Sequence, residues 1–227
     1  MQTPAEKYLI EKVVERLRLN DKSVRPVKIL NIGAGKDSIL EKGIQDKFGA
    51  SFICDRLDVV DCRAQYPAVG RCLIASVESM PEIESGGHEI AFANYVLEHV
   101  ENLPKAAAEI ARVLAPAGYF ISSLPNPIAP EFLLSKYTPT KFHQLIKGKG
   151  EGRHAHETRY AYGNIKELIK IFDQYFSVVE IRYWPILYEY LYRFPLVGWL
   201  GKIYDGLVKI LNIKMLMGNV CVVLKKK

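Results

Sequence analysis

Cysteines are scarce in this sequence of 227 residues, and their spacing does not match a known framework. They lack the C-x-x-C pairs of a zinc ribbon and the density of a disulfide-stapled secreted domain. They are Cys54, Cys62, Cys72 and Cys221. No run of about 18 apolar residues is available for a membrane-spanning helix, and charged residues break the apolar stretch that a signal peptide would need near the start. These absences predict a cytoplasmic globular protein with free thiols.

Charge is unevenly distributed along the chain. Residues 1–127 hold 15 Lys and Arg against 17 Asp and Glu, whereas residues 128–227 hold 16 against 8. A basic half of this kind attracts anionic partners such as phosphorylated substrates, nucleic acids or lipid headgroups. A solvated basic surface that only keeps the protein soluble is the alternative interpretation.

Strand and helix patterns alternate along most of the chain. Helices are expected over residues 4–19, 38–48, 104–114 and 164–175, and strands over residues 27–32, 51–54, 71–75, 89–94, 119–124, 178–183 and 220–224. This alternation predicts an α/β fold, with a mostly parallel sheet covered by helices on both faces.

One domain is expected over residues 1–227. Its parts are an N-terminal helix (1–25), a cofactor-binding core (26–124), a proline-rich insertion or lid after the fifth strand (125–162) and a C-terminal part (163–227) with a helix, strands and an aromatic segment.

A glycine turn follows the first strand. Gly33-Ala34-Gly35 lets the backbone approach a ligand closely. Asp55 is expected at the end of the next strand, where a carboxylate can accept hydrogen bonds from both hydroxyls of a ribose. Ser38 occupies the position of the third glycine in the dinucleotide fingerprint. The pattern therefore favours an adenosine-containing ligand over a nicotinamide cofactor.

Three segments together resemble the class I S-adenosylmethionine-dependent methyltransferases, especially the broad group that includes ubiquinone and menaquinone biosynthesis enzymes. They are residues 29–35 (ILNIGAG), 94–100 (NYVLEHV) and 111–118 (ARVLAPAG), and the resemblance covers about residues 27–124. It implies a Rossmann-like sheet of seven strands whose final strand is antiparallel. It also implies a transferase that uses S-adenosyl-L-methionine.

The resemblance assigns roles to individual residues. Gly33 and Gly35 would pass against the methionine part of the cofactor and Asp55 would hold the ribose, with Asp58 as the alternative if the second strand runs longer. The full cofactor-binding set is Asn31, Gly33, Ala34, Gly35, Asp55, Arg56, Ser76, Val77, Glu78, Asn94 and Tyr95, in which residues 76–78 border the adenine and residues 94–95 face the sulfonium. Asn31 and Ser76 depart from the family because acidic residues are usual at both positions.

Glu98 and His99 allow a metal-dependent interpretation. Some relatives hold a divalent metal with Glu-x-x-Glu-His, but Tyr95 replaces the first Glu here. Because one hard oxygen ligand is lost, we expect no metal, with Glu98 at a helix start and His99 packed.

The insertion supplies the candidate bases for a hydroxyl acceptor. They are His143, His154, His156 and Tyr160, for each of which a solvent-exposed loop residue is the alternative. The sulfonium is already activated, so the transfer otherwise depends on proximity and orientation.

An aromatic cluster distinguishes the C-terminal part. Residues 183–204 hold eight of the 24 aromatic residues, and within residues 196–211 the polar Lys202, Asp205 and Lys209 recur at helical spacing against a broad apolar face. This pattern is typical of a helix at a membrane interface or on an apolar partner, and equally of a helical cap between two strands.

These observations together predict a methyltransferase for a small-molecule, saccharide or lipid-linked acceptor, modified at oxygen. Peripheral contact with the inner face of a membrane is part of this hypothesis. Nucleic acid is a lesser substrate class, because no RNA-binding motif is present. The alternatives are an RNA methyltransferase and a noncatalytic module of the same fold that binds a membrane or a protein partner.

Overall fold

A computed structural model describes residues 2–20, 26–49, 52–137, 161–192 and 195–227. The strands are β1 (Val27–Ile32), β2 (Phe52–Asp58), β3 (Val69–Ile74), β4 (His88–Asn94), β5 (Leu114–Pro125), β6 (Phe176–Trp184) and β7 (Asn219–Lys226). The helices are α1 (Pro4–Asn20), α2 (Ile39–Phe48), α3 (Leu103–Val113), α4 (Pro130–Tyr137), α6 (Ile165–Phe172), α7 (Leu187–Leu191) and α8 (Pro195–Ile210), with short 3-10 helices η1 (Leu97–His99) and η2 (Lys214–Leu216).

All seven strands form one sheet in the order β3-β2-β1-β4-β5-β7-β6. Neighbouring strands are parallel except for β7, which runs antiparallel to both β5 and β6. The predicted α/β fold, including the antiparallel final strand, is confirmed. The carboxyl ends of the parallel strands therefore lie at one edge, where ligands of such sheets bind.

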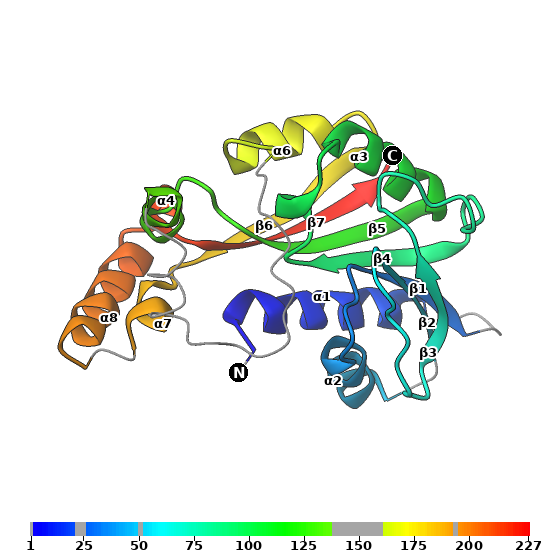
Figure 1. Ribbon diagram of the computed structural model, residues 1–227, viewed down its shortest axis with the longest axis horizontal. Coiled ribbons are helices and arrows are strands. Elements are labelled where there is room, and N and C mark those ends of the chain that lie inside the picture. The colour runs from blue at the N-terminus through cyan, green and yellow to red at the C-terminus, as the bar shows by residue number, and fades with distance from the viewer. Residues whose placement is uncertain (1, 21–25, 50–51, 138–160, 193–194) are drawn as a thin grey trace.

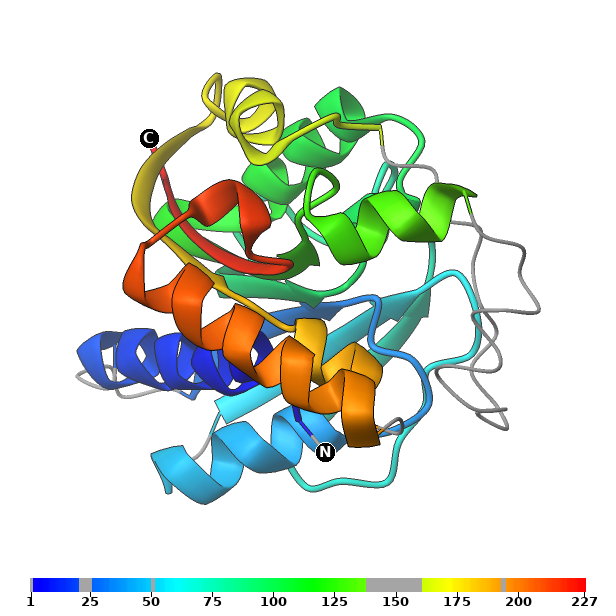
Figure 2. The ribbon, with the colours of Figure 1, turned by 90° about the vertical axis from the view of Figure 1, so that its left-hand side faces the viewer.

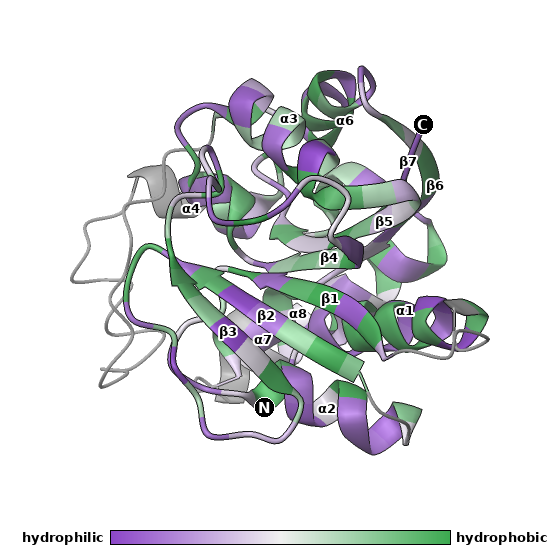
Figure 3. Cartoon of the chain, turned by 90° about the vertical axis from the view of Figure 1, so that its right-hand side faces the viewer, coloured by the Kyte–Doolittle hydropathy of each residue, from purple (hydrophilic) through white to green (hydrophobic). Residues whose placement is uncertain are grey.

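Helices cover both faces of the sheet. Figure 1 shows α3 and α6 on one face and α1 and α2 on the other. Each interface has its own cluster of buried apolar side chains, and the central strands β1 and β4 contribute to both. These strands are largely hydrophobic in Figure 3, as expected for strands buried on both faces.

The second strand is longer than predicted. It was expected over residues 51–54, but β2 continues to Asp58 because its backbone pairs with β1 as far as Ile32↔Leu57 and with β3 as far as Asp58↔Ile74. The strand end, and with it the edge where a ligand binds, therefore falls three residues later than Asp55.

The helices α4, α7 and α8 extend from the carboxyl edge. The end of β5 and the end of β6 both pair with the start of β7, through Pro125↔Asn219 and Trp184↔Asn219. The segments that leave these strand ends lie together at one end of the molecule (Figure 1). No helix among the described residues is both long and apolar enough to span a membrane.

Candidate cofactor-binding site

The glycine turn between β1 and α2 is tied to the end of β2. The backbone amide of Gly33 donates to the carbonyl of Leu57 at 2.7 Å, and Gly33 and Gly35 have positive φ angles of 69° and 64°. A Cβ atom on Gly33 would lie 2.3 Å from Cγ2 of Val96, whereas one on Gly35 would meet nothing within 4 Å. The first glycine is thus required for packing, and the second faces open space.

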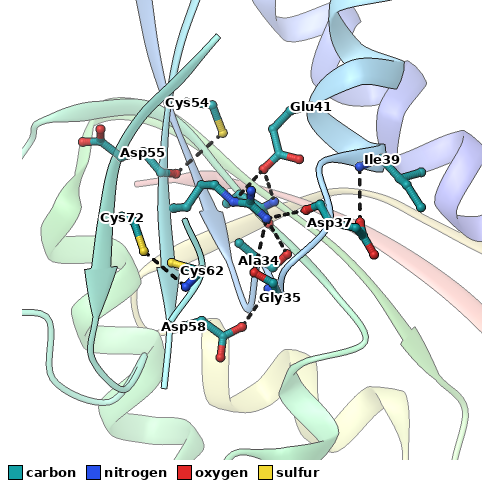
Figure 4. A network of polar contacts seen from close by, with 12 residues as sticks. Ala34, Gly35, Asp37, Ile39, Glu41, Cys54, Asp55, Asp58, Cys62 and Cys72 are labelled. Carbon is teal, nitrogen blue, oxygen red and sulfur yellow. Dashed lines mark hydrogen bonds and ion pairs between the residues drawn. The ribbon is translucent and has the colours of Figure 1, made fainter. Parts of the chain in front are cut away.

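Arg56 supports the turn from behind. Its side chain is fully buried, and Nη2 donates to the carbonyls of Ala34 at 2.8 Å, Gly35 at 3.3 Å and Asp37. Glu41 lies 3.3 Å from Nε of Arg56 and balances its charge. Figure 4 shows Glu41 and the turn residues around this network. Arg56 was predicted to contact the cofactor, but the structure places it where it fixes the shape of the turn.

Asn31 belongs to the same buried network. Its Nδ2 donates to Oε1 of Glu41 at 2.7 Å, while its Oδ1 has no hydrogen-bond partner. The acidic residue that relatives usually carry at position 31 would place a second carboxylate beside Glu41. The asparagine therefore fits this chain, because it donates to the carboxylate already present.

Asp58, at the end of β2, closes the site. Its Oδ2 accepts from the backbone amide of Gly35 at 2.8 Å and its Oδ1 accepts from Val60 at 3.2 Å. Each carboxylate oxygen has two lone-pair directions, so both keep capacity for another donor. The carboxylate beside the glycine turn is therefore that of Asp58, the alternative that the sequence left open.

Asp55 lies inside β2 and not at its end, contrary to the prediction. The residue is 5% exposed, and its carboxylate accepts from Arg71 Nη2 at 2.7 Å and from the Arg71 backbone amide at 2.9 Å. Nε2 of the buried His88 lies 3.1 Å from the same carboxylate. His88 and Arg71 hold the pKa of Asp55 well below its usual range, despite the opposing effect of burial. Figure 4 shows this side chain turned away from Gly35, and so it ties β2 to neighbouring segments.

The three residues predicted to border the adenine, Ser76, Val77 and Glu78, differ in their exposure and contacts. Ser76 is exposed and its Oγ accepts from the backbone amide of Glu78, whereas Val77 is buried in the core beneath. Oε1 of Glu78 accepts from the amides of Glu101 and Asn102 at 2.9 and 3.0 Å. Glu78 therefore joins the β3 loop to the start of α3.

The first turn of α1 lies over the end of β4. Nδ2 of Asn94 donates to Oε1 of Glu6 at 2.9 Å, and the hydroxyl of Tyr95 lies 3.3 Å from Oγ1 of Thr3. Thr3 and Glu6 also bond to each other's backbone amides, which is a capping box. Sequence reasoning missed this contact, although T-P-A-E is a recognisable capping signal. Tyr95 has φ 55°, a strained backbone conformation of the kind that gathers at functional sites.

Two buried carboxyls near the carboxyl edge were not predicted as functional. Burial raises the pKa of Glu98 to about 8, and Oε2 of Glu98 has no hydrogen-bond partner. Burial also raises the pKa of Glu131, at the start of α4, to about 7, and neither of its oxygens has a partner. The candidate bases His143, His154, His156 and Tyr160 lie outside the described residues. Among the residues that are described, no three His, Cys, Asp or Glu side chains form a group suited to a metal ion.

Comparisons with known proteins identify methyltransferases among the similar sequences and folds. Residues 30–122 match the family model described as a methyltransferase domain. A malonyl-[acyl-carrier protein] O-methyltransferase of Halorhodospira halophila is 30% identical over 127 residues, which are 50% of this chain and 42% of that protein. The chain thus matches less than half the length of this curated relative.

Solved structures of low sequence identity share the fold. A geranyl diphosphate C-methyltransferase of Streptomyces coelicolor A3(2) matches with a TM-score of 0.52 at 14% identity, over 95% of this chain and 76% of that one. A phosphoethanolamine N-methyltransferase 2 of Haemonchus contortus matches with a TM-score of 0.57 at 13% identity, over 98% of this chain and 56% of that one. Residues 30–122 thus match a methyltransferase domain and the sheet has the fold of solved methyltransferases, which together support the S-adenosylmethionine-dependent family that the motifs resemble.

Proposed function

We propose that this methyltransferase domain transfers the methyl group of S-adenosyl-L-methionine to an oxygen atom of an anionic saccharide or lipid-linked acceptor. The observation that carries the cofactor half is the contact between Asp58 and Gly35, which places a carboxylate beside an open glycine turn at the carboxyl edge of the sheet. The basic C-terminal part and its exposed aromatic residues support the acceptor half.

The cofactor is assigned to this edge residue by residue. Gly33 and Gly35 take the methionine part, and Asp58 replaces Asp55 as the ligand of the ribose hydroxyls because Asp58 lies beside the glycine turn and keeps capacity for further donors. Ser76 and the exposed Val59 border the adenine. A planar base fits between such segments without a charged partner.

Asn94 and Tyr95 lie on the sulfonium side. The bound cofactor supplies an activated methyl group, so the chain has to bind, orient and exclude water. The first turn of α1 performs the last task, since Glu6 and Thr3 contact this pair directly.

A hydroxyl acceptor must also give up a proton when its oxygen bonds to the methyl carbon and the carbon–sulfur bond breaks. The predicted bases His143, His154, His156 and Tyr160 remain candidates for this proton. Glu131 joins them, because it lies at the carboxyl edge, carries no hydrogen-bond partner and has a pKa near neutrality, which suits a general base.

The choice of acceptor rests on chemistry that surrounds the site. Tyr188, Tyr192 and Trp199 are exposed at the carboxyl edge, and such rings bind sugars and acyl chains. The curated relative is named for oxygen methylation of an acyl-carrier-bound malonyl group, which is also an anionic oxygen acceptor. RNA remains the lesser substrate class.

Calorimetric titration with S-adenosylhomocysteine tests the cofactor half. We expect Asp58→Asn to weaken binding by about tenfold or more, because it loses charge-assisted hydrogen bonds. Asp55→Asn is the matched control and should lower stability while it keeps the affinity. Gly33→Val should abolish binding, because its side chain collides with Val96.

Release of S-adenosylhomocysteine in the presence of soluble and lipid-linked saccharides then tests the acceptor half. Turnover with uncharged amines only would overturn the assignment to oxygen. A folded wild-type protein that binds no S-adenosylhomocysteine would favour the noncatalytic module instead.

A further inference from the structure

The segment between β6 and β7 folds into a helical hairpin that is held together from inside. Both oxygens of Asp205 on α8 accept from the backbone amides of Leu187 and Tyr188 at the start of α7, at 3.0 and 2.9 Å. Gly201 lets the helices approach, because a Cβ atom there would lie 3.1 Å from Cα of Tyr188. Val208 is buried on the same side. The inner side of α8 is therefore fixed against α7 and the body of the protein.

The opposite side of α8 is apolar and faces solvent. Its exposed residues recur at intervals of three and four, which places them on one stripe of a helix. This α8 outer face consists of Trp199, Leu200, Ile203, Leu207, Ile210 and Leu211. Their exposed fractions run from 43% for Ile203 to 80% for Ile210. In Figure 2, α8 crosses the front of the molecule, so no other described element covers this face.

Positive charge borders the α8 outer face. Lys202, Lys209 and Lys214 are exposed, and Asp205 is the only acidic residue in the sequence from 195 to 217. Because Asp205 is occupied by the amides of α7, its carboxylate lies on the inner side. Electrostatic interactions join Glu189 on α7 to Asp205 on the inner side of α8, and to Glu6 and Lys7 in the first turn of α1. The charge beside the apolar stripe is thus basic.

We propose that the α8 outer face docks on the surface of a bilayer that contains anionic phospholipids. An apolar stripe with a tryptophan and flanking lysines is the pattern of a helix that lies in the plane of the interface, with its apolar side chains among the acyl chains and its lysines at the headgroups. The three lysines complement an anionic surface and would gain nothing from a neutral apolar partner. The helix is 16 residues long and carries two lysines, so it lies on the membrane and does not cross it.

Docking in this orientation has a consequence for the acceptor. The hairpin leaves the sheet at the end of β6 and returns at the start of β7, which is the same edge as the glycine turn. A bilayer under α8 therefore brings the candidate active site near lipid-linked molecules. This consequence rests on the proposed function, whereas docking itself does not.

Vesicle binding tests the proposal with the full chain and no acceptor. Wild type is expected to sediment with vesicles of phosphatidylcholine and phosphatidylglycerol, and more weakly with phosphatidylcholine alone. The double variant Ile203→Ser/Ile210→Ser should bind about tenfold more weakly or worse, because two apolar side chains are lost from the interface. The double variant Lys202→Gln/Lys209→Gln should lose the additional binding to anionic vesicles and keep the weaker binding to phosphatidylcholine alone. Leu19→Ser is the matched control, because Leu19 is 59% exposed at the far end of α1 and should not matter.

Two further readouts keep failure interpretable. S-adenosylhomocysteine titration of each variant shows whether it is folded. A wild-type protein that binds vesicles but does not bind S-adenosylhomocysteine would contradict the proposed function and leave the docking proposal intact. Trp199→Phe should remove the vesicle-induced blue shift of tryptophan fluorescence, because Trp184 is then the only tryptophan in the sequence. Equal vesicle binding by wild type and Ile203→Ser/Ile210→Ser would overturn the proposal. So would a wild-type dimer in solution that the same double variant converts to a monomer.

Discussion

At the scale of one residue, the end of strand β2 determines whether Asp55 or Asp58 lies beside the glycine turn. The two carboxylates are three positions apart and so point to opposite faces of a strand, and only the extent of pairing determines which of them meets the glycine turn. Local propensity does not fix that extent. The sequence therefore supplied both candidates, and the backbone pairing of β2 with β1 and β3 selected Asp58 as the neighbour of Gly35.

Glu98 makes stability depend on pH. Its pKa is 4.5 when unfolded and about 8 when folded, so between these values the unfolded chain has released a proton that the folded protein keeps. The free energy of unfolding therefore falls as pH rises through this window, by about 1.4 kcal/mol for each unit of pKa difference. Glu98→Gln cannot ionise and should gain stability relative to wild type as pH increases from about 5 to about 8.

Urea unfolding of wild type and Glu98→Gln at both ends of that window measures the effect. Glu89→Gln is the control, because Glu89 on the neighbouring strand β4 is only half-buried. A stability difference between Glu98→Gln and wild type that stays constant with pH would contradict the assignment.

At the scale of elements, α8 shows how tertiary contacts bear on two open interpretations of an amphipathic helix. The pattern of Lys202, Asp205 and Lys209 is compatible with an apolar face at a membrane or on a partner, and equally with a helical cap between two strands. In the structure Asp205 points inward to cap α7, while Ile203 and Ile210 point outward. The start of α7 offers unpaired backbone amides, and a carboxylate that satisfies them is stabilised there.

Two glycines of α8 are predicted to respond in opposite ways to alanine. A Cβ atom at Gly201 would lie 3.1 and 3.2 Å from backbone atoms of Tyr188, whereas one at Gly206 meets nothing within 4 Å. Gly206→Ala should therefore raise the free energy of unfolding by about 0.5–1 kcal/mol through helix propensity. Gly201→Ala should lower it, because α7 has to move away.

Thermal unfolding of both variants, with circular dichroism as the probe, compares them directly. Equal stabilisation by the two substitutions would show that α7 and α8 are not in close contact. The far-ultraviolet spectrum serves as the control for helix content.

For the whole molecule, three phenylalanines far apart in sequence hold one face of the sheet. Phe120 on β5 stacks on Phe172 of α6 at 5.7 Å between ring centroids, and Phe176 on β6 lies 5.9 Å from Phe172. All three are almost fully buried. Because they join β5, α6 and β6, their cluster connects the half of the sheet that holds β1–β5 to the C-terminal half.

Phe172→Ala is expected to lower the free energy of unfolding by about 3–5 kcal/mol, since it leaves a cavity in this cluster. Leu19→Ala, at a side chain that is 59% exposed, should change it by less than about 0.5 kcal/mol. Denaturant unfolding measures both. A change of less than about 1 kcal/mol in the free energy of unfolding of Phe172→Ala would mean that this cluster does not hold the two halves of the sheet together.

The sequence by itself determined the alternation of strands and helices, the glycine turn and the segments by which the domain is identified, because these depend on periodicity and on residue types that act locally. Tertiary structure decided which carboxylate reaches the turn, because strand pairing sets where β2 ends. It also placed Arg56 behind the turn and brought Glu6 to Asn94, since each contact joins segments that only the assembled sheet places together. Tertiary structure also determined which side of α8 is exposed. Asp205 accepts hydrogen bonds from the backbone amides of α7, so the opposite, apolar side of α8 faces solvent.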